Sequence, residues 1–403
     1  MNILFLSVYT INGIEDRNLY SDLLRKFRNE GHKVFIATPS ERRNKKNTTL
    51  IKQNGTEILS IKTPNLQKTN FLEKGFGLLL LPFLFKKHIS RFFKNIEFDL
   101  ILYSTPPITF TGLIHYYKKK YGAKSYLLLK DIFPQNAVDL GFISKQNPAY
   151  WYFRKKEKAL YKYSDVIGCM SPANISYLKT HNAWLHNKPI EVCPNSIEPL
   201  KTFISDSEKL EIRQKYGLRP ESVLLIYGGN LGKPQGLDFL LKVIENTKEL
   251  DTLFFLIFGS GTESPRLKWW FNQNMPKNAA FFETVPKTDF DLLVQASDAG
   301  MIFLDRRFTI PNFPSRLLNY LECSKPVIAA TDKNTDLGSI ITENGFGFWC
   351  ESGDLKGFKK NITRLISEKE QLKAMGEKGR KFLEEHYLVS TAYSTIMKHF
   401  NQK

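Results

Sequence analysis

The chain has 403 residues and a formal net charge of +18, from 58 Lys and Arg against 40 Asp and Glu. This length allows about two or three domains, and a hydrophobic fraction of 42% excludes a disordered chain. The four Cys residues form no CxxC pair, which argues against a disulfide framework or zinc ribbon and favours a reducing, cytoplasmic compartment. The longest apolar run, residues 75–85, is shorter than the roughly 20 residues that a membrane-spanning helix needs.

The excess positive charge belongs to one half of the chain. Residues 1–200 contain 30 Lys and Arg against 15 Asp and Glu, a net charge of +15, whereas the remainder has a net charge of +3. A basic half indicates an anionic partner, and nucleic acid, an acidic membrane and phosphorylated substrates are the alternatives.

Short apolar runs alternate with helical patterns along the whole chain. The first run has no basic segment before it and no small-residue cleavage site after it, so we expect a strand there and not a signal peptide. In the first half, the strands are expected at residues 3–8, 33–37, 58–61, 100–103, 125–129 and 166–169, with a helix at 19–29. In the second half, they are expected at residues 223–227, 254–258, 280–282, 299–304 and 326–330, with a helix at 237–247.

This alternation predicts an α/β protein with two doubly wound parallel sheets. The polar stretch 199–221 is the expected domain boundary, and the tail 369–400 is expected to form two or more helices. Ligands of such sheets bind at the carboxyl ends of the strands, so we expect the site in a cleft between the two domains.

Two glycine-rich turns follow strands in the second half, YGGNLGKPQG at 227–236 and FGSG at 258–261. Glycine lets the backbone approach a ligand closely, and the N-terminus of a following helix attracts phosphate. The first turn has neither the dinucleotide-binding nor the P-loop spacing, and a plain strand–helix turn is the alternative interpretation.

A third motif, FPSRLLNYLECSKPVIAA at 313–330, contains a candidate phosphate ligand. Pro314 suits the first turn of a helix, and the Ser315 hydroxyl is expected to cap free backbone N–H groups. Arg316 would then present its guanidinium to a diphosphate. The alternative is a surface arginine on a capped helix.

Taken in order, these motifs, together with ENGFGFWCESGD at 343–354, resemble the retaining glycosyltransferases of family 4. The first half agrees through ILFLSVY, DIFPQNAVDLG and VCPNSIE, and the likeness is nearest to O-antigen and capsule sugar transferases. The resemblance implies a GT-B fold with two facing Rossmann-like domains. Residues 1–200 would bind the acceptor, with a C-terminal helix of about 386–403 packing back, and residues 201–385 would bind a nucleotide sugar.

The resemblance assigns donor binding to the glycine turns, a strand end and the third motif: Gly229, Asn230, Lys233, Gln235, Gly259, Gly261, Glu283, Val285, Pro314, Ser315, Arg316 and Asn319. Many members have two glutamates where this chain has Pro311 and Asn319, and an Arg and a Lys at positions 230 and 235. Arg316 would therefore have to neutralise the negative charge of the diphosphate, with Lys233 as a second cation. No metal or cofactor is expected.

Acceptor binding is assigned to Asn12, Gly13 and Arg17, for which a helix-capping loop is the alternative. Asp131 and Arg316 are the candidate catalytic residues. Asp131 follows a strand, where it would hydrogen-bond a sugar hydroxyl or accept the acceptor's proton. The alternatives are a turn aspartate and proton transfer to the departing phosphate.

The segment 71–93 combines apolar and basic residues, of which Leu79, Phe83, Lys86, Lys87 and Arg91 are candidate membrane contacts. A buried helix with a solvated basic face is the alternative. The resemblance implies a saccharide on a polyprenol diphosphate as acceptor, and a peripheral location on the inner face of the cytoplasmic membrane.

The sequence therefore predicts transfer of a hexose or N-acetylhexosamine from a nucleotide-diphosphate sugar, with UDP as the expected nucleotide. A non-hydrolysing nucleotide-sugar epimerase of the same fold is the first rival, but it needs several acidic and His residues in the cleft. A nucleic-acid-binding protein is the second, but no aromatic–basic RNA motif is present, so we expect no nucleic-acid partner.

Overall fold

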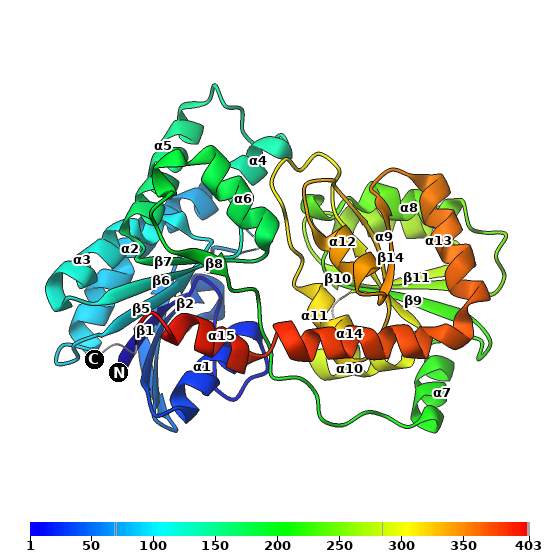
Figure 1. Cartoon of the computed structure of the whole chain (residues 1–403), viewed down its shortest axis with the longest axis horizontal. Coiled ribbons are helices and arrows are strands. Elements are labelled where there is room, and N and C mark those ends of the chain that lie inside the picture. The colour runs from blue at the N-terminus through cyan, green and yellow to red at the C-terminus, as the bar shows by residue number, and fades with distance from the viewer. Residues whose placement is uncertain (68, 70, 284, 401–403) are drawn as a thin grey trace. The chain divides into compact units, whose positions relative to one another are not determined.

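A computed structural model of the chain describes residues 1–67, 69, 71–283 and 285–400, without the side chains of Phe71, Leu72 and Lys74. The last three residues of the predicted C-terminal helix lie outside this range. The chain forms two compact units (Figure 1). Unit 1 comprises Met1–Glu198 and Leu388–Lys403, and unit 2 comprises Pro199–Tyr387.

Unit 1 contains an eight-stranded sheet in the order β3-β4-β2-β1-β5-β6-β7-β8. All neighbours are parallel except β3, which is antiparallel to β4. The strands are β1 (Asn2–Leu6), β2 (Lys33–Glu41), β3 (Thr49–Gln53), β4 (Thr56–Thr63), β5 (Leu100–Ser104), β6 (Lys124–Leu129), β7 (Val166–Cys169) and β8 (Ile190–Val192). Buried apolar residues on both faces of the sheet explain the nearly continuous hydrophobic runs of its central strands.

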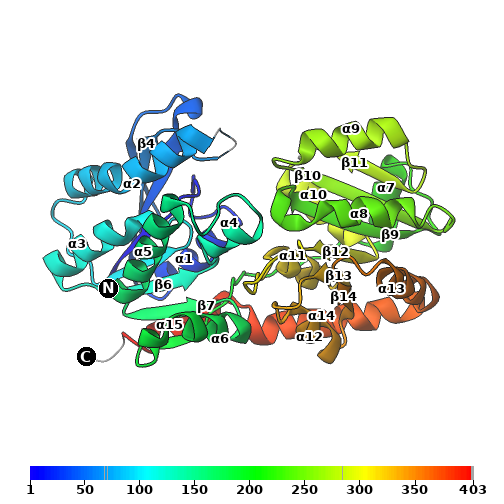
Figure 2. The same cartoon turned by 90° about the horizontal axis from the view of Figure 1, so that it is seen from above.

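The helices of unit 1 cover both faces of this sheet (Figure 2). Three of them pack side by side in the order α2 (Phe71–Phe92), α3 (Thr111–Tyr121) and α5 (Pro148–Tyr163). On the opposite face α1 (Leu19–Asn29) packs against α15 (Val389–Met397). The shorter elements are η1 (Arg42–Asn44), η2 (Ile108–Phe110), α4 (Gln135–Asp139), α6 (Pro172–His181) and η3 (Ala183–Leu185).

Specific contacts fix the chain's return to unit 1. The Val389 backbone N–H donates to the Ile197 carbonyl over 3.2 Å, immediately before α15 crosses α1. The Tyr393 ring lies edge-on against Phe27, with 4.9 Å between centroids, and its hydroxyl is 2.9 Å from Nε2 of His32. The last helix is therefore part of the core of unit 1.

Unit 2 contains a six-stranded parallel sheet in the order β11-β10-β9-β12-β13-β14. The strands are β9 (Val223–Asn230), β10 (Leu253–Ser260), β11 (Ala279–Phe282), β12 (Ala299–Phe303), β13 (Val327–Thr331) and β14 (Gly347–Glu351). The helices are α7 (Asp206–Lys215), η4 (Lys233–Gln235), α8 (Leu237–Glu245), α9 (Ser264–Asn274), α10 (Lys287–Ala296), α11 (Arg316–Glu322), α12 (Leu337–Glu343), α13 (Leu355–Ser367), η5 (Lys369–Gln371) and α14 (Leu372–His386).

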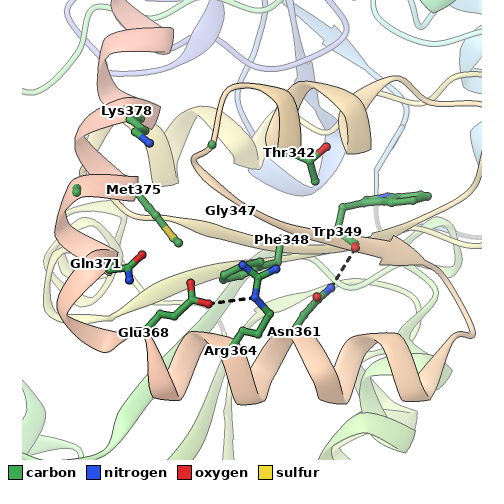
Figure 3. A pocket seen from close by; sticks show the side chains of 12 residues that line it. Thr342, Gly347, Phe348, Trp349, Asn361, Arg364, Glu368, Gln371, Met375 and Lys378 are labelled. Atoms are coloured by element: carbon green, nitrogen blue, oxygen red, sulfur yellow. Dashed lines mark hydrogen bonds and ion pairs between the residues drawn. The ribbon is translucent and has the colours of Figure 1, made fainter.

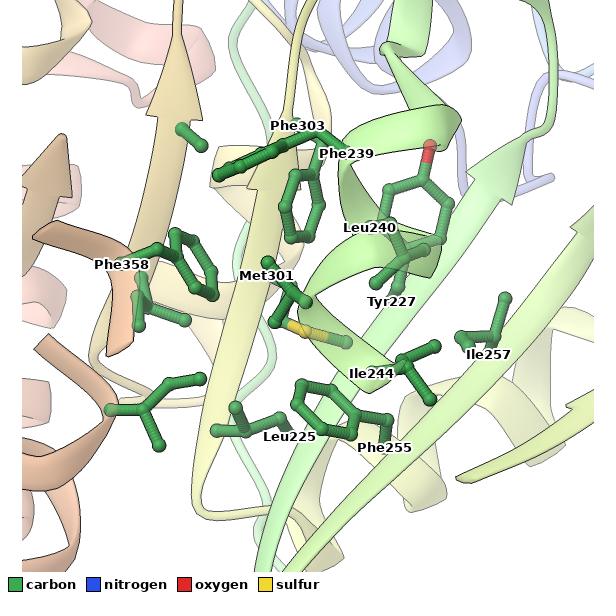
Figure 4. Close-up of a cluster of buried hydrophobic side chains, with 14 of the residues drawn as sticks. Leu225, Tyr227, Phe239, Leu240, Ile244, Phe255, Ile257, Met301, Phe303 and Phe358 are labelled. Atoms are coloured by element: carbon green, nitrogen blue, oxygen red, sulfur yellow. The ribbon is translucent and has the colours of Figure 1, made fainter. Parts of the chain in front are cut away.

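Figure 4 shows how α8 and α13 close one face of this sheet. The aromatic rings of Phe239 and Phe303 lie 6.1 Å apart, and Phe358 from α13 lies 5.3 Å from Phe303. Around them lie Leu225, Phe255 and Met301 from three neighbouring strands, which are fully buried. This core stabilises the strands whose ends form the candidate site.

The prediction of two doubly wound sheets is confirmed, and the expected helix 19–29 coincides with α1. Three short strands were not anticipated, namely β3, β8 and β14. The boundary stretch contains α7, which begins with a capping box between Ser205 and Glu208. Its polar composition concealed this helix, because none of its residues is buried.

Candidate functional site

The strand order of unit 2 reverses between β9 and β12, where the connections leave toward opposite sides of the sheet. Ligands of doubly wound sheets bind at this point, outside the carboxyl ends of the strands. The first glycine turn begins in the last residues of β9, and the segment leading to Arg316 follows β12. The two are joined by a hydrogen bond from the Asp305 N–H to the Pro234 carbonyl, over 3.0 Å.

The glycines of the two turns allow the turns to pack on each other. A Cβ atom at Gly259 would lie 2.0 Å from the Gly229 carbonyl oxygen, and one at Gly261 would lie 2.4 Å from the Leu231 oxygen. The Leu231 N–H donates to the Ser260 carbonyl over 3.0 Å. Gly259 and Gly261 are thus required for backbone packing between two loops, in addition to any role at a ligand.

Arg316 starts α11 and lies over the first glycine turn. Its Nη2 donates to Oε1 of Gln235 over 2.6 Å and reaches the Asn230 carbonyl at 3.5 Å. The guanidinium carbon lies 4.1 Å from the ring centroid of Tyr227. These contacts bring together four of the predicted donor residues, because Gly229 also faces Nη2, at 4.0 Å from its ideal Cβ position.

The other terminal nitrogen of Arg316, Nη1, is buried and has no hydrogen-bond partner among the described residues. A buried, charged donor without a partner is energetically unfavourable, and most such groups in proteins are satisfied. Tyr227 and Gln235 hold the guanidinium in place, so Nη1 cannot easily turn toward solvent. The geometry leaves a donor available to an anion at this point.

Two further cations follow β12 directly and were missed in the sequence. Arg307 pairs with Asp305 through both carboxylate oxygens, at 2.9 and 2.6 Å. Although burial opposes it, this pair and the nearby Lys233 lower the pKa of Asp305. Arg306 is exposed and extends toward Gly353. Their position after a predicted strand was the available signal for both arginines.

One detailed expectation for the third motif is wrong. Ser315 precedes α11 but makes no capping hydrogen bond, and its backbone has helical angles (φ −65°, ψ −18°) in place of the extended angles typical of a capping residue. Pro314 and Asn319 are partly buried on either side of it. At the end of β11, Glu283 is exposed and pairs with Lys268 at 3.1 Å, and Val285 is partly buried two residues later.

In unit 1 the strand order reverses between β1 and β5. The loop after β1 contains the predicted acceptor residues Asn12, Gly13 and Arg17. The Gly13 carbonyl accepts a hydrogen bond from the Ser21 hydroxyl over 3.2 Å, and Nη2 of Arg17 reaches the Glu198 carbonyl at 3.5 Å. Asn12 is exposed. The loop is therefore anchored at Gly13 and Arg17.

Asp131 follows β6 at the same edge of the sheet. The amide Nδ2 of Asn136 lies 2.8 and 2.7 Å from its two carboxylate oxygens, and the Thr105 hydroxyl donates to its carbonyl over 3.0 Å. Burial raises the pKa of Asp131 to about 6, although hydrogen bonds from Ile132 and Asn136 favour the charged form. Burial and the Asp131 charge together raise the pKa of Tyr9, which follows β1.

Tyr9, Thr105 and Asn136 were missed in the sequence as neighbours of Asp131. Tyr9 and Thr105 each follow a strand beside the point of reversal, which was the available signal. Asn136 belongs to the quoted DIFPQNAVDLG motif, but only the structure shows its contact with Asp131.

Helix α2 carries the predicted membrane residues on its outer face. Phe76, Leu79 and Phe83 are 62%, 54% and 65% exposed, whereas Leu81 and Phe85, on the other side of the helix, are buried. Lys86, Lys87 and Arg91 continue the exposed face. One side of α2 is therefore buried, as the alternative expects, and its outer face exposes apolar side chains together with the basic ones. Across the described residues, every helix falls short of the length or apolar character needed to cross a bilayer.

A separate cavity of about 440 Å³ lies beside β14 (Figure 3). It is lined by Phe348 at the start of that strand, by Arg364 from α13, and by Met375 and Lys378 from α14. The Arg364 guanidinium pairs with Glu368 at 3.1 Å. Since strand starts lie at the sheet edge opposite the strand ends, this cavity does not belong to the site at Arg316. No cluster of three or more His, Cys, Asp or Glu suited to a metal occurs in the described part of the chain.

Comparison with known proteins agrees with this arrangement. Residues 18–199 match the family described as "Glycosyltransferase Family 4", and residues 208–382 match "Glycosyl transferases group 1". The chain is 25% identical to the probable glycosyltransferase WbjE of Pseudomonas aeruginosa, covering 81% of this chain and 80% of that protein.

Two solved structures share the fold. HepE of Anabaena, in complex with UDP-glucose, has a TM-score of 0.70 at 14% identity, covering 99% of both chains. WaaG, a glycosyltransferase involved in lipopolysaccharide biosynthesis, has a TM-score of 0.69 at 14% identity, covering 99% of this chain and 100% of that one. At these identities the likeness establishes the fold.

Replacing Asp131 by Asn should stabilise the protein at neutral pH by about 1–2 kcal/mol, because the variant no longer keeps a partly buried charge. The folded-state pKa is raised to about 6, so the destabilisation is absent below the unfolded pKa of 3.8 and grows as pH rises to about 6. The difference in Tm between variant and wild type should therefore increase from pH 4 to pH 6.5. A Tm difference that does not vary with pH would contradict the raised pKa of Asp131.

Gly236 and Gly217 offer a matched test of packing at the strand ends. Both have a left-handed backbone (φ +57° and +66°), but a Cβ at Gly236 would lie 2.9 Å from the Leu304 carbonyl oxygen, whereas one at Gly217 would meet nothing within 4 Å. Gly217→Ala should cost about 1–2 kcal/mol from backbone strain alone. Gly236→Ala should cost clearly more in urea unfolding, and equal losses would contradict the packing.

Proposed function

We propose that this chain, which belongs to the family 4 glycosyltransferases of GT-B fold, transfers a hexose or N-acetylhexosamine from a UDP-sugar to a lipid-linked saccharide. The transfer would retain the anomeric configuration, require no metal, and serve surface polysaccharide assembly such as that of O-antigen or capsule. The observation that carries this proposal is the buried, unpartnered Nη1 of Arg316 beside the glycine turn.

The chemistry of a leaving nucleoside diphosphate fits this site. Negative charge accumulates on the diphosphate as the glycosidic bond breaks, and a preorganised cation stabilises that charge best. Many family members place an Arg and a Lys in the first glycine turn, where this chain has Asn230 and Gln235. Gln235 instead orients Arg316, which supplies the charge from α11. Lys233 and Arg306 follow the same two strands and would add positive charge, whereas the charge of Arg307 is balanced by Asp305. The proposal therefore relies on side-chain cations and needs no metal.

The choice of UDP and of the pathway rests on fold relatives. HepE, in complex with UDP-glucose, supports UDP-sugars as the first donors to test. WaaG, involved in lipopolysaccharide biosynthesis, supports a surface glycan as the product class. The remaining donor residues, Gly229, Glu283, Val285 and Asn319, would contact the nucleoside or the sugar.

In unit 1 we assign Asp131 to the acceptor hydroxyl, as hydrogen-bond acceptor or proton acceptor. With a pKa of about 6 its carboxylate is charged at neutral pH, and Asn136 orients both of its oxygens. Arg17 and the anchored Asn12–Gly13 loop would bind the acceptor diphosphate or saccharide. The exposed apolar and basic face of α2 would place the protein on an anionic membrane, at the inner face of the cytoplasmic membrane.

Arg316→Ala should weaken UDP binding by about 10- to 100-fold and lower transfer by about 100-fold or more, because it removes a charged hydrogen-bond donor to the diphosphate. Arg364→Ala is a matched control, since Arg364 also stacks on an aromatic ring, at 4.6 Å from the Phe348 centroid, but lies beside β14. Titration calorimetry with UDP measures the first effect. Equal binding by both variants would contradict the proposed donor site.

The transfer rate should rise with pH through about 6, because Asp131 must lose its proton before it can accept one. The ascending limb of kcat/KM against pH should have its midpoint near that value with the wild-type chain. Asp131→Asn should lower the rate and remove this limb. A variant that keeps both the rate and the limb would exclude a role of Asp131 in proton transfer.

A further inference from the structure

The three helices α2, α3 and α5 run in the same direction along one face of unit 1. Each connects two neighbouring or nearby parallel strands, β4 to β5, β5 to β6 and β6 to β7, so each must run antiparallel to the sheet. The starts of all three helices therefore lie at the carboxyl edge of the strands, which is the edge that contains Asp131. Contacts of α3 with both α2 and α5 make the three helices one continuous layer (Figure 2).

This layer carries a large share of the positive charge of the chain. The sequences of α2, α3 and α5 contain twelve Lys and Arg against two Glu, whereas α1 and α15 on the opposite face contain three Lys and Arg against one Asp. The excess positive charge of the unit 1 helices is thus concentrated on one face of the sheet.

Helix α5 shows the same internal order as α2. Its outer face reads Trp151, Lys155, Lys158 and Lys162, at a spacing of three or four residues, and all four are exposed. Trp151 is 63% exposed and Tyr152 is 42% exposed. In α2 the apolar residues Phe76, Leu79 and Phe83 likewise precede Lys86, Lys87 and Arg91, whereas Lys74 comes before them in the sequence.

In α2 and α5 the exposed apolar side chains consequently lie nearer the Asp131 edge, and most of the cations lie behind them. Helix α5 packs directly on the loop that contains Asp131, because the Phe153 ring lies edge-on against Phe133, two residues after Asp131, with 5.0 Å between centroids.

We propose that the α2–α3–α5 layer is a single docking surface for an anionic membrane, in which Trp151 and Tyr152 of α5 form a second interfacial anchor beside Asp131. This rests on the proposed function, since it would present a membrane-anchored acceptor to that edge. Exposed aromatic residues are typical of the membrane–water interface, and neighbouring lysines are attracted to anionic headgroups. Two anchors also satisfy the need for more than one weak signal in stable membrane attachment.

Co-sedimentation with phosphatidylglycerol–phosphatidylcholine vesicles, compared with pure phosphatidylcholine, tests the surface. Lys155→Glu/Lys158→Glu should weaken binding by at least about 25-fold, at about fivefold for each lost lysine charge, and Trp151→Ala/Tyr152→Ala by about tenfold. Trp269→Ala on α9 is the aromatic control, because Trp269 is also 63% exposed. Lys356→Glu/Lys360→Glu on α13, both exposed, is the charge control.

Losses in both α5 variants, with intact binding in both controls and unchanged Tm, would support the surface. Unchanged vesicle binding in either α5 variant would overturn it, as would tighter binding of the wild-type chain to duplex DNA than to the anionic vesicles. The readout is independent of the proposed transfer reaction. A wild-type chain that binds vesicles but no UDP would contradict the donor site and leave the surface supported.

Discussion

The Arg316 guanidinium lies where β9 and β12 diverge, and three groups determine its position. Gln235 accepts a hydrogen bond from it, Tyr227 lies beneath it, and the packing of α11 fixes its Cα. One of its nitrogens is left buried without a partner. The glycines allow the two turns to pack closely on each other, and Gly229 of the first turn lies beside the guanidinium. A charge that the protein holds but does not satisfy is a preorganised site for an anion.

Unit 1 holds a carboxylate at the corresponding edge of its own sheet. Asp131 is kept partly buried, and Asn136 orients it while Thr105 fixes its backbone. Burial raises its pKa, so that charge and proton affinity are balanced near neutral pH. Each sheet thus has one charged side chain at its carboxyl edge, a guanidinium in unit 2 and a carboxylate in unit 1, and the proposed function assigns the first to the donor and the second to the acceptor.

The sequence predicted the fold because the buried strands are nearly continuous apolar runs, as at 100–103 and 223–227. It did not predict α7 or β3, whose residues are mostly exposed and have no such pattern. Arg316 and Asp131 were identified by motif and by their position after strands. Their partners Gln235 and Asn136 were quoted in motifs, but the contacts depend on how loops fold back, which no local pattern encodes. Ser315 was misjudged because capping depends on backbone angles.

The central claim is that one correctly placed cation at the ends of β9 and β12 binds the donor diphosphate. Which of the two segments supplies that cation is less important than its position. Relocating the charge tests this most directly, by calorimetry of UDP binding to Arg316→Gln and to Gln235→Lys/Arg316→Gln. The account predicts that the single variant loses binding and that the double variant recovers a substantial part of it. Undiminished binding by Arg316→Gln, or no recovery in a folded double variant, would contradict it.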